Sequence, residues 1–542
     1  MQGTAQIIDI NGRPIGRTGR PQNSGLSNGA ASLESASLLG WNWWGGSSDD
    51  DIVQHLPIVR QRCRDLVLNA PVVAGMINTI STNVVGQGLI PTPTPDVELL
   101  GMSSVEADNW KKTVLRYWED WAESKEADIH RRDNFYELQQ LAHRAVLESG
   151  DVFAVLPYHT YPGSRSLLDL RVQLIEADCI SDPTLSDNGR KQVKGDIYGG
   201  VEIGDYGEVV AYHVATRHPL SKRNPIRFNG EPLVREWVRI PAVGPETGRR
   251  NILHIMRSQR PGQRRGIPAL APIVESIKML DRFLKAELQA ALVQSLFTAA
   301  IKTSVPEASL GEFREMYSQS GDDRQTPSQK FYEENGMIEM GSGTIGFLAP
   351  NDDIVPVGVT HPSSGFGPFV DAVLKMIGGA LGLPFEMVVM MFSTSFSASR
   401  AAMNMASANF KIQRDWMTWD FSQPIYEEFL ANVVAKGYIK APGFFTDPLK
   451  RRAYCSAKWA GPADLQIDPQ KEYAAYQMAI GLGAMTYSDV AAKTGSDYRQ
   501  NAAVLHEEQK IYDAQSWDRQ PLKASSVPQD AVMNGGKQSA DE

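Results

Sequence analysis

Three carboxylates in the first third of the chain, Glu176, Asp178 and Asp182, have the types and spacing best suited to acid–base chemistry. Two carboxylates can divide the roles of general acid and general base when their surroundings separate their pKa values. This leaves one enzymatic interpretation open, a soluble α+β hydrolase that uses Glu176 and Asp178. No histidine or lysine stands at a spacing that obviously supports it, so a solvent-exposed strand end is the simpler interpretation.

Two glycine-containing strings formally match enzyme motifs. Residues 25–29 read Gly-Leu-Ser-Asn-Gly, the pattern of an esterase nucleophile elbow, but no strand precedes them and no helix follows. Residues 341–346 read Gly-Ser-Gly-Thr-Ile-Gly, but the next residues, Phe-Leu-Ala-Pro-Asn, cannot open the helix that a dinucleotide site requires. No G-x-x-x-x-G-K-[ST] loop that could cradle ATP occurs. The sequence therefore predicts no cofactor and no enzymatic activity.

The cysteines and acidic clusters do not predict a metal site. Cys63, Cys179 and Cys455 are odd in number and far apart, which fits free thiols in a reducing compartment. They lack the paired spacing of a zinc site. Aspartates at positions 49–51 diverge as successive side chains, and they suit the positive end of a helix dipole.

Length and charge limit the classes of protein that remain. A chain of 542 residues should divide into several hydrophobic cores. No apolar run approaches the roughly 20 residues that a membrane helix needs, so we expect no membrane partner. The net charge of −9 argues against a protein that grips DNA through its phosphates. It is compatible with a conduit through which DNA passes without being held.

The elements that position these residues are mixed. Helices are expected at 52–85, 105–122 and 134–149, and the tryptophans of the second helix fit a buried stripe better than a base-stacking surface. Strand patterns follow at 152–158, 168–175, 209–215 and 237–240, whereas the prolines of 91–95 predict a break. Residues 268–301 have the clearest helical periodicity in the chain. Three more helices are expected at 470–480, 487–493 and 497–515.

The segment 365–437 is the centre of this organisation. Apolar residues at helical spacing follow Gly365, and Pro384 should stop that helix. An apolar loop comes next, and a long helix begins near Ser397. Pro424 should kink or break this helix, and Gly437 should end it. Two helices joined by such a loop could simply be the αα-hairpin of a core.

Several strings resemble the lambda-type portal family of tailed phages. Residues 260–266 read Arg-Pro-Gly-Gln-Arg-Arg-Gly before the long helix, and similar strings lie at 369–374, 382–386 and 396–402. The resemblance implies a portal-type α+β fold assembled as a ring. In that family the subunit has an α/β wing, a helical stem, a small α/β clip and a C-terminal helical crown.

The resemblance also implies boundaries along the chain. The expected divisions are a flexible arm (1–45), the α+β wing (46–267), a long helix into the stem (268–301), the clip (302–356), a second stem helix (357–386), a tunnel loop (387–397), the wing's long helix and return (398–460), the crown (461–518) and a disordered tail (519–542).

Candidate site residues follow from the same resemblance. The tunnel loop would line a DNA channel with residues of low charge, which are Val389, Met390, Met391, Phe392, Ser393, Thr394 and Ser395. The charged stem candidates are Lys278, Arg282 and Lys375.

The resemblance further implies a role in the virion. The chain would form a homo-oligomeric ring, with twelve subunits in the family, at the portal vertex of the capsid after assembly in the host cytoplasm. The ring would let double-stranded DNA pass non-specifically during packaging and ejection. It would contact capsid and scaffold proteins, the terminase large subunit and a head–tail adaptor.

Overall fold

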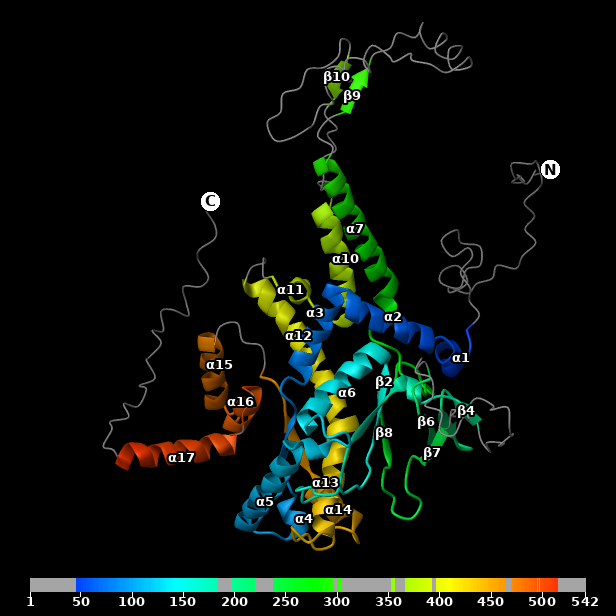
Figure 1. The fold of residues 1–542 in the computed structure, drawn as a ribbon. Helices are drawn as coiled ribbons and strands as arrows, with labels where there is room; N and C mark the ends of the chain where they lie inside the picture. Colours follow the sequence, from blue (N-terminus) through cyan, green and yellow to red (C-terminus); the bar gives the residue numbers. More distant parts are fainter. Residues whose placement is uncertain are drawn as a thin grey trace, which may run out of the picture.

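The computed structural model is an α+β molecule, which confirms the expected fold class. It describes residues 45–183, 196–219, 237–296, 300–303, 352–355, 366–391, 396–463, 469–494, 496 and 498–514. A mixed body carries a projecting pair of helices at one end and three C-terminal helices at one side (Figure 1). Within these residues, no helix combines the length and the apolar composition needed to cross a membrane.

The first helices begin and end where capping chemistry places them. Ser47 and Asp50 exchange hydrogen bonds in a capping box, so the expected helix start at the aspartates is confirmed. Pro71 opens a new helix because a first turn does not need its missing N–H. The helices of this part are α1 (Ser48–Ile52), α2 (Leu56–Asn69), α3 (Pro71–Val84), α4 (Val97–Leu100), α5 (Ser104–Ala122) and α6 (Phe135–Ser149).

The tryptophans of α5 form the centre of the main core. Trp118 is 0% exposed, and its ring meets Phe135 at 5.1 Å and Phe429 at 5.0 Å with perpendicular planes. Trp121 is equally buried and donates its indole N–H to the carbonyl of Leu170. Edge-to-face aromatic packing adds to the apolar area that these rings bury. The buried-stripe interpretation is confirmed, and base stacking by these rings is excluded.

Two antiparallel sheets lie beside this core. In the first, β2 (Asp151–Val155) is central between β3 (Gln173–Glu176) and β8 (Ile252–Met256). The second has the order β4 (Asp196–Tyr198), β5 (Val201–Ile203), β6 (Val209–Ala215) and β7 (Trp237–Pro241). The sequence patterns located β6 and β7 well, overestimated the lengths of β2 and β3, and did not predict β4, β5 or β8. Phe153 and Tyr212 join the two sheets with ring centroids 5.4 Å apart.

The projecting pair consists of α7 (Val274–Leu296) and α10 (Phe366–Leu381), which lie side by side in Figure 1. Phe283 holds them together through Phe366 and Phe369, at 5.6 and 5.1 Å between ring centroids. The expected helix over 268–301 is too long at both ends. Pro272 lies in the short 3₁₀ helix η3 (Ala271–Ile273), because proline is tolerated only near a helix start. At the other end, β9 (Ala300–Thr303) pairs with β10 (Asp352–Val355) instead.

A long interrupted helix begins near the base of the projecting pair and runs through the body (Figure 1). It comprises α12 (Phe396–Met417), a π-helical turn η4 (Thr418–Ser422) and α13 (Gln423–Ala435). The π turn stands directly before Pro424, which confirms the expected interruption. Gly437 has a φ of +75° and donates its N–H to the carbonyl of Val434, which confirms the expected helix end.

The structure corrects the prediction for the proline-rich residues 91–95. The sequence predicts a break there, whereas β1 (Ile90–Pro93) pairs antiparallel with β11 (Ala457–Ala460), just after α14 (Pro448–Cys455). A two-stranded ladder has edges on both sides, so prolines can occupy it without removing a hydrogen bond from a central strand.

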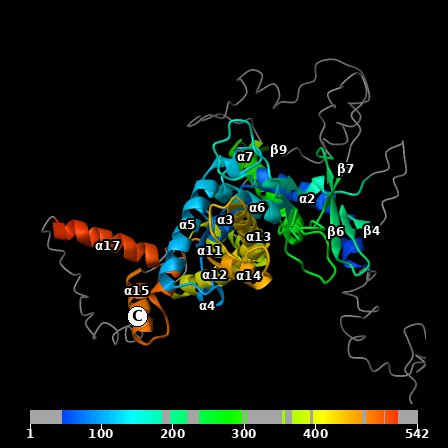
Figure 2. The same cartoon turned by 90° about the horizontal axis from the view of Figure 1, so that it is seen from below.

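The C-terminal helices confirm their predicted ranges within one or two residues. They are α15 (Pro469–Gly481), α16 (Tyr487–Lys493) and α17 (Tyr498–Ala514), and Figure 2 shows α17 extending away from the body. The expected arm (1–45, except residue 45), the tail (519–542) and most of the clip (302–356) lie outside the described residues, as does the glycine string at 341–346.

Candidate functional site

The base of the projecting pair is a continuous apolar core. Ile277 and Leu280 of α7 are 4% and 5% exposed and pack in one cluster with Leu374 and Ile377 of α10. These residues are spaced three apart on each helix, so one face of each helix is buried. α3 contributes buried side chains to the same cluster, which anchors the pair in the body.

Further from the body, the apolar stripe of α7 continues where the chain itself no longer covers it. Leu288 is 63% exposed and Leu292 is 57% exposed. Phe369 and Met376 of α10 are 52% and 58% exposed. Leu288 and Leu292 lie one helical turn apart on α7, and exposed apolar patches on a monomer mark interaction sites.

The three charged stem candidates lie in different surroundings. Lys278 has its Nζ 4.0 Å from an oxygen of Asp65, both side chains being more than half exposed. Lys375 has its Nζ 4.9 Å from the ring centroid of Phe385, in the range of a cation–π contact. Arg282 lies on an exposed position of α7. Lys278 and Arg282 lie one helical turn apart on α7, and Lys375 lies on the neighbouring helix α10.

The expected tunnel loop is shorter than predicted at its N-terminal end. Val389 belongs to the short helix α11 (Phe385–Val389), which begins directly after Pro384 and packs against α10. Gly378 permits this packing, because a Cβ there would lie 2.8 Å from a methyl group of Val388. Residues 385–389 form a helix instead of a loop because Met387, which is 8% exposed, and its apolar neighbours are buried in the core at the base of α10.

The segment leaves the core at the next residue. Met390 adopts a left-handed backbone conformation with a φ of 53°, uncommon for a residue with a side chain. Its side chain is 68% exposed and that of Met391 is 64% exposed. The remaining loop candidates, Phe392, Ser393, Thr394 and Ser395, lie outside the described residues.

The carboxylates of the hydrolase interpretation are parts of ion pairs. Asp178 accepts hydrogen bonds from Arg60, at 3.4 Å, and from Arg64. Glu176 is 65% exposed and lies 3.2 Å from His218. Two guanidinium groups therefore neutralise Asp178, while Glu176 stands at the surface. The hydrolase interpretation has no support from this arrangement.

A buried charge cluster beneath the projecting pair was not predicted. Asp151, 0% exposed, accepts hydrogen bonds from Arg60 at 2.8 Å and from Arg265 at 2.7 Å. Its second oxygen also accepts the backbone N–H of Gly266 at 3.0 Å. Burial alone would raise the pKa of Asp151, but the two arginines outweigh it and hold the pKa well below its usual range. The cluster needs three distant parts of the chain, so no local pattern could reveal it.

The same cluster explains the Arg-Pro-Gly-Gln-Arg-Arg-Gly string. Arg265 also donates to the carbonyls of Ala177 and Ile180, which fixes the string to both sheets. Gly266 passes so close to Gly150 that a Cβ on it would lie 2.0 Å from the Gly150 oxygen. Arg260 pairs with Asp51 of α1 at 2.7 Å. The string therefore ties the segment leading into α7 to both sheets.

The cysteines behave as the sequence predicts. All three are free thiols, and Cys63 and Cys455 are buried. Burial raises the pKa of each of these two thiols to about 12, so both stay protonated at neutral pH. In the described parts of the chain, histidine, cysteine and carboxylate side chains form no group of three that could hold a metal ion.

The lambda-family phage portal protein model matches residues 34–414, and the chain therefore belongs to that family. Portal protein B of Escherichia phage lambda is 24% identical over 540 residues, which are 98% of this chain and 96% of the relative. The portal protein of Escherichia phage N15 is 23% identical over 90% of both chains. Portal proteins are structural, which agrees with the expectation that this chain is not an enzyme.

Solved structures also resemble the model. One is a chain in the neck of a native gene transfer agent particle, computed with C12 symmetry, which is 13% identical with a TM-score of 0.40. The match covers 84% of this chain and 95% of that one. A chain in the neck of an empty particle is 15% identical with a TM-score of 0.40, over 85% of this chain and 97% of that one.

Proposed function

We propose that this chain forms a closed ring at the portal vertex of a phage capsid and that DNA passes through its central channel. The exposed apolar side chains on α7 and α10 carry the proposal, because they continue the buried stripe beyond what one chain covers. In a closed ring one face of each subunit contacts a different face of its neighbour. Such a contact would cover Leu288 and Leu292. Twelve subunits is the number that the family suggests.

The channel wall would include the apolar segment between α11 and α12. The proposed lining residues are Val389–Ser395, of which Met390 and Met391 have exposed side chains outside the core. Duplex DNA carries one charge per roughly 1.7 Å of its axis, so a wall rich in lysine would hold it. Methionine, phenylalanine, serine and threonine carry no charge. A lining of these residues would let the duplex slide with little resistance.

The charged stem residues would act between subunits. Lys278, Arg282 and Lys375 occupy exposed positions on α7 and α10. We assign α7 and α10 to the stem, residues 46–267 and 398–460 to the wing, and α15–α17 to the crown. In this assignment β9 and β10 lead into the clip, which is the natural docking region for a terminase large subunit or a head–tail adaptor. Capsid and scaffold proteins would contact the outside of the ring after assembly in the host cytoplasm.

Electron microscopy of the purified full-length chain tests the proposal. We expect rings with a central hole, and light scattering should give a mass many times 59.7 kDa. Particles that stay monomeric across salt and protein concentrations, also with a scaffold protein present, would refute the ring.

A further inference from the structure

The helix α12 and the π-helical turn that continues it carry a row of apolar side chains that is exposed in the single chain. Met405, Ile412 and Trp419 are 77%, 59% and 69% exposed. They follow one another at intervals of seven residues, which is close to two helical turns, so they lie on the same side of the helix. The row is roughly 21 Å long at 1.5 Å per residue.

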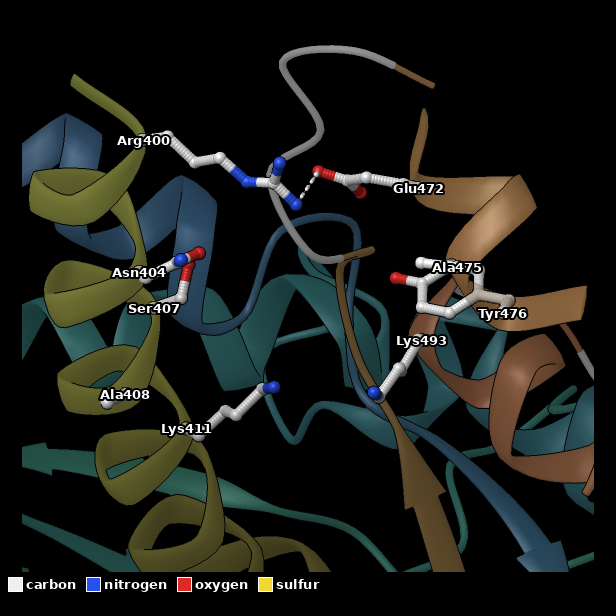
Figure 3. Close-up of a pocket in the computed structure, with 9 residues that line it drawn as sticks. All are labelled: Arg400, Asn404, Ser407, Ala408, Lys411, Glu472, Ala475, Tyr476 and Lys493. Carbon is white, nitrogen blue, oxygen red and sulfur yellow. Dashed lines mark ion pairs between the residues drawn. The ribbon is translucent and has the colours of Figure 1, made fainter. Parts of the chain in front are cut away.

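Other sides of α12 are turned toward the chain itself. Phe410 and Met417, also seven residues apart, are 3% and 0% exposed in the two main cores. A further side, which includes Arg400, faces Glu472 of α15 across a pocket (Figure 3). A surface helix of a monomer typically buries one apolar face and exposes polar residues elsewhere. The second apolar face of α12 therefore indicates an interaction site.

The helix α17 is also exposed in the single chain. Every residue from Asn501 to Ile511 is exposed, and among them Val504 and Ile511 are 54% and 53% exposed. Most helices in proteins are stabilised by the packing of an apolar face and not by propensity alone. Val504 and Ile511 are again seven residues apart, so α17 carries a row with the same period as the row on α12.

The turn before α17 directs this helix away from α12 of the same chain. Tyr498 stacks on Tyr487 of α16, with 5.8 Å between the ring centroids. Asn501 donates a hydrogen bond to the hydroxyl of Ser496 at 2.9 Å. These contacts fix the start of α17, and Figure 2 shows the rest of the helix extending away from the body. The row on α17 is therefore presented to another molecule.

We propose that α17 of one copy of this chain packs on the apolar row of α12 in a second copy. Rows that repeat every seven residues stay in contact along two helices, so Val504 and Ile511 pack against Ile412 and its neighbours in the row. The two surfaces differ, as the contact between successive subunits of a closed ring requires. The inference rests on the proposed function, to which it adds a C-terminal helix that reaches the neighbouring subunit.

The size of this contact indicates a partner that other contacts already hold in place. A large side chain buries at most about 250 Å², so the three residues of the α12 row supply roughly 500 Å². A stable complex buries about 800 Å² per partner. The row is therefore too small to hold a free protein or peptide durably. In a ring the neighbouring copy is present at a high effective concentration, and a small contact is then sufficient.

Site-specific cross-linking of the full-length chain tests the contact. Ile412→Cys and Ile511→Cys are placed in separate copies, both of which carry Cys179→Ser. Cys63 and Cys455 should not react, because they are buried and burial raises the pKa of each thiol to about 12. The two copies are co-expressed and treated with a short bismaleimide. We expect a cross-linked species with the mass of two chains.

Matched cysteines define what would overturn the proposal. Leu449→Cys, at a 64% exposed position on α14, replaces Ile412→Cys as the control and should give little or no cross-linked species with Ile511→Cys. Copies that all carry Ile412→Cys should give none either, because α12 meets α17 and not another α12. Cross-linking within one chain that carries both cysteines, or absence of the species from the mixed copies, would overturn the contact whether or not rings form.

Hydrogen exchange tests the same contact without cysteines. The backbone amides of α17 should exchange about tenfold or more slowly in rings than in monomers, and Ile412→Asp should remove most of this difference. This substitution should leave the monomer folded, because Ile412 is 59% exposed. Leu449→Asp should preserve the difference. Rings in which α17 exchanges as fast as in monomers refute only the contact, and cross-linked pairs without rings refute only the proposed ring.

Discussion

At the scale of single residues, the features that matter most are buried polar groups with defined partners. Asp151 neutralises two arginines that reach it from α2 and from the string before α7. The partners come from elements that pack only in the folded chain. A polar group buried this deeply is costly without its partners, so its substitution should have a large effect.

Asp151→Asn should destabilise the protein by about 3–5 kcal/mol, because it leaves Arg60 and Arg265 buried beside a neutral side chain. Chemical denaturation at neutral pH measures the change. Asp108→Asn is the matched control, since Asp108 is half exposed in its pair with Lys111 and should contribute less than about 1 kcal/mol. Similar effects of the two substitutions would contradict the assignment of Asp151 as a structural anchor.

His143 should make stability depend on pH. Burial lowers the pKa of its imidazole from 6.5 to about 4, although its hydrogen bond to Gln413 opposes the change. Between these pH values the imidazole is protonated in the unfolded chain but neutral in the folded chain. The free energy of unfolding therefore falls as the pH drops through this range. This group should contribute a loss of about 2 kcal/mol between pH 7 and pH 5.

The variant His143→Gln isolates this effect, because glutamine stays neutral at both pH values. The difference in unfolding free energy between pH 7 and pH 5 should be smaller in the variant by that amount. His506→Gln, on the exposed helix α17, should leave the difference as it is in the wild type. An unchanged difference in His143→Gln would show that the imidazole is accessible to protons in the folded protein.

At the scale of elements, the stretch from α10 to α12 changes from core to surface within a few residues. Met387 is 8% exposed and Met391 is 64% exposed, only four positions apart. The left-handed conformation of Met390 lies between them and turns the chain out of α11. The αα-hairpin interpretation treats the helices on both sides of this turn as parts of a core, whereas the channel proposal concerns the exposed residues that begin at Met390.

These two methionines give a matched test of the proposed channel lining. Met391→Asp should leave folding and ring assembly nearly unchanged, because the new carboxylate stays in water. DNA packaging or retention should fall, more strongly at low salt, because the carboxylates repel phosphates. Met387→Asp should cost several kcal/mol, because it buries a charge without a partner. Packaging assays on soluble rings and chemical denaturation of both variants test these expectations. If Met391→Asp unfolds the protein, Met391 belongs to the core and does not line the channel.

At the scale of the whole molecule, α7 and α10 project from a body that has its own cores. Two helices bury only the faces that they turn to each other, and here large apolar side chains remain outside that contact. The proposed ring would supply the missing contact by placing the next subunit against this surface. The monomer and the assembly should therefore respond differently to a charge placed there.

Leu288→Asp should keep the monomer folded and should reduce ring formation, because Leu288 is 63% exposed in the single chain. Light scattering reports assembly, and circular dichroism reports folding. Leu449→Asp, at a 64% exposed position on α14 in the body, provides the control and should still assemble. If Leu288→Asp forms normal rings, the contact between subunits lies elsewhere on the molecule.

Local patterns in the sequence determined most of the helices. The aspartates 49–51 at a helix start, the helix over 134–149 and the stripe of tryptophans on α5 depend on neighbours within a few residues, and all were predicted without a fold. The α+β class and the interruption at Pro424 followed in the same way. The portal interpretation came from the resemblance of a few strings to a known family. Physical patterns alone were equally consistent with an αα-hairpin in a core.

Only the tertiary structure decided where these elements meet. Asp151 joins arginines 91 and 114 positions away, and no periodicity encodes such a contact. The proline-rich residues expected to form a break are the strand β1, because they pair with β11. The first residues of the expected loop belong to the helix α11, because Met387 is buried. The pocket that Arg400 of α12 and Glu472 of α15 help to line likewise needs these two helices side by side (Figure 3). Propensity and capping act over one or two helical turns, whereas burial and charge pairing depend on neighbours that only folding brings together.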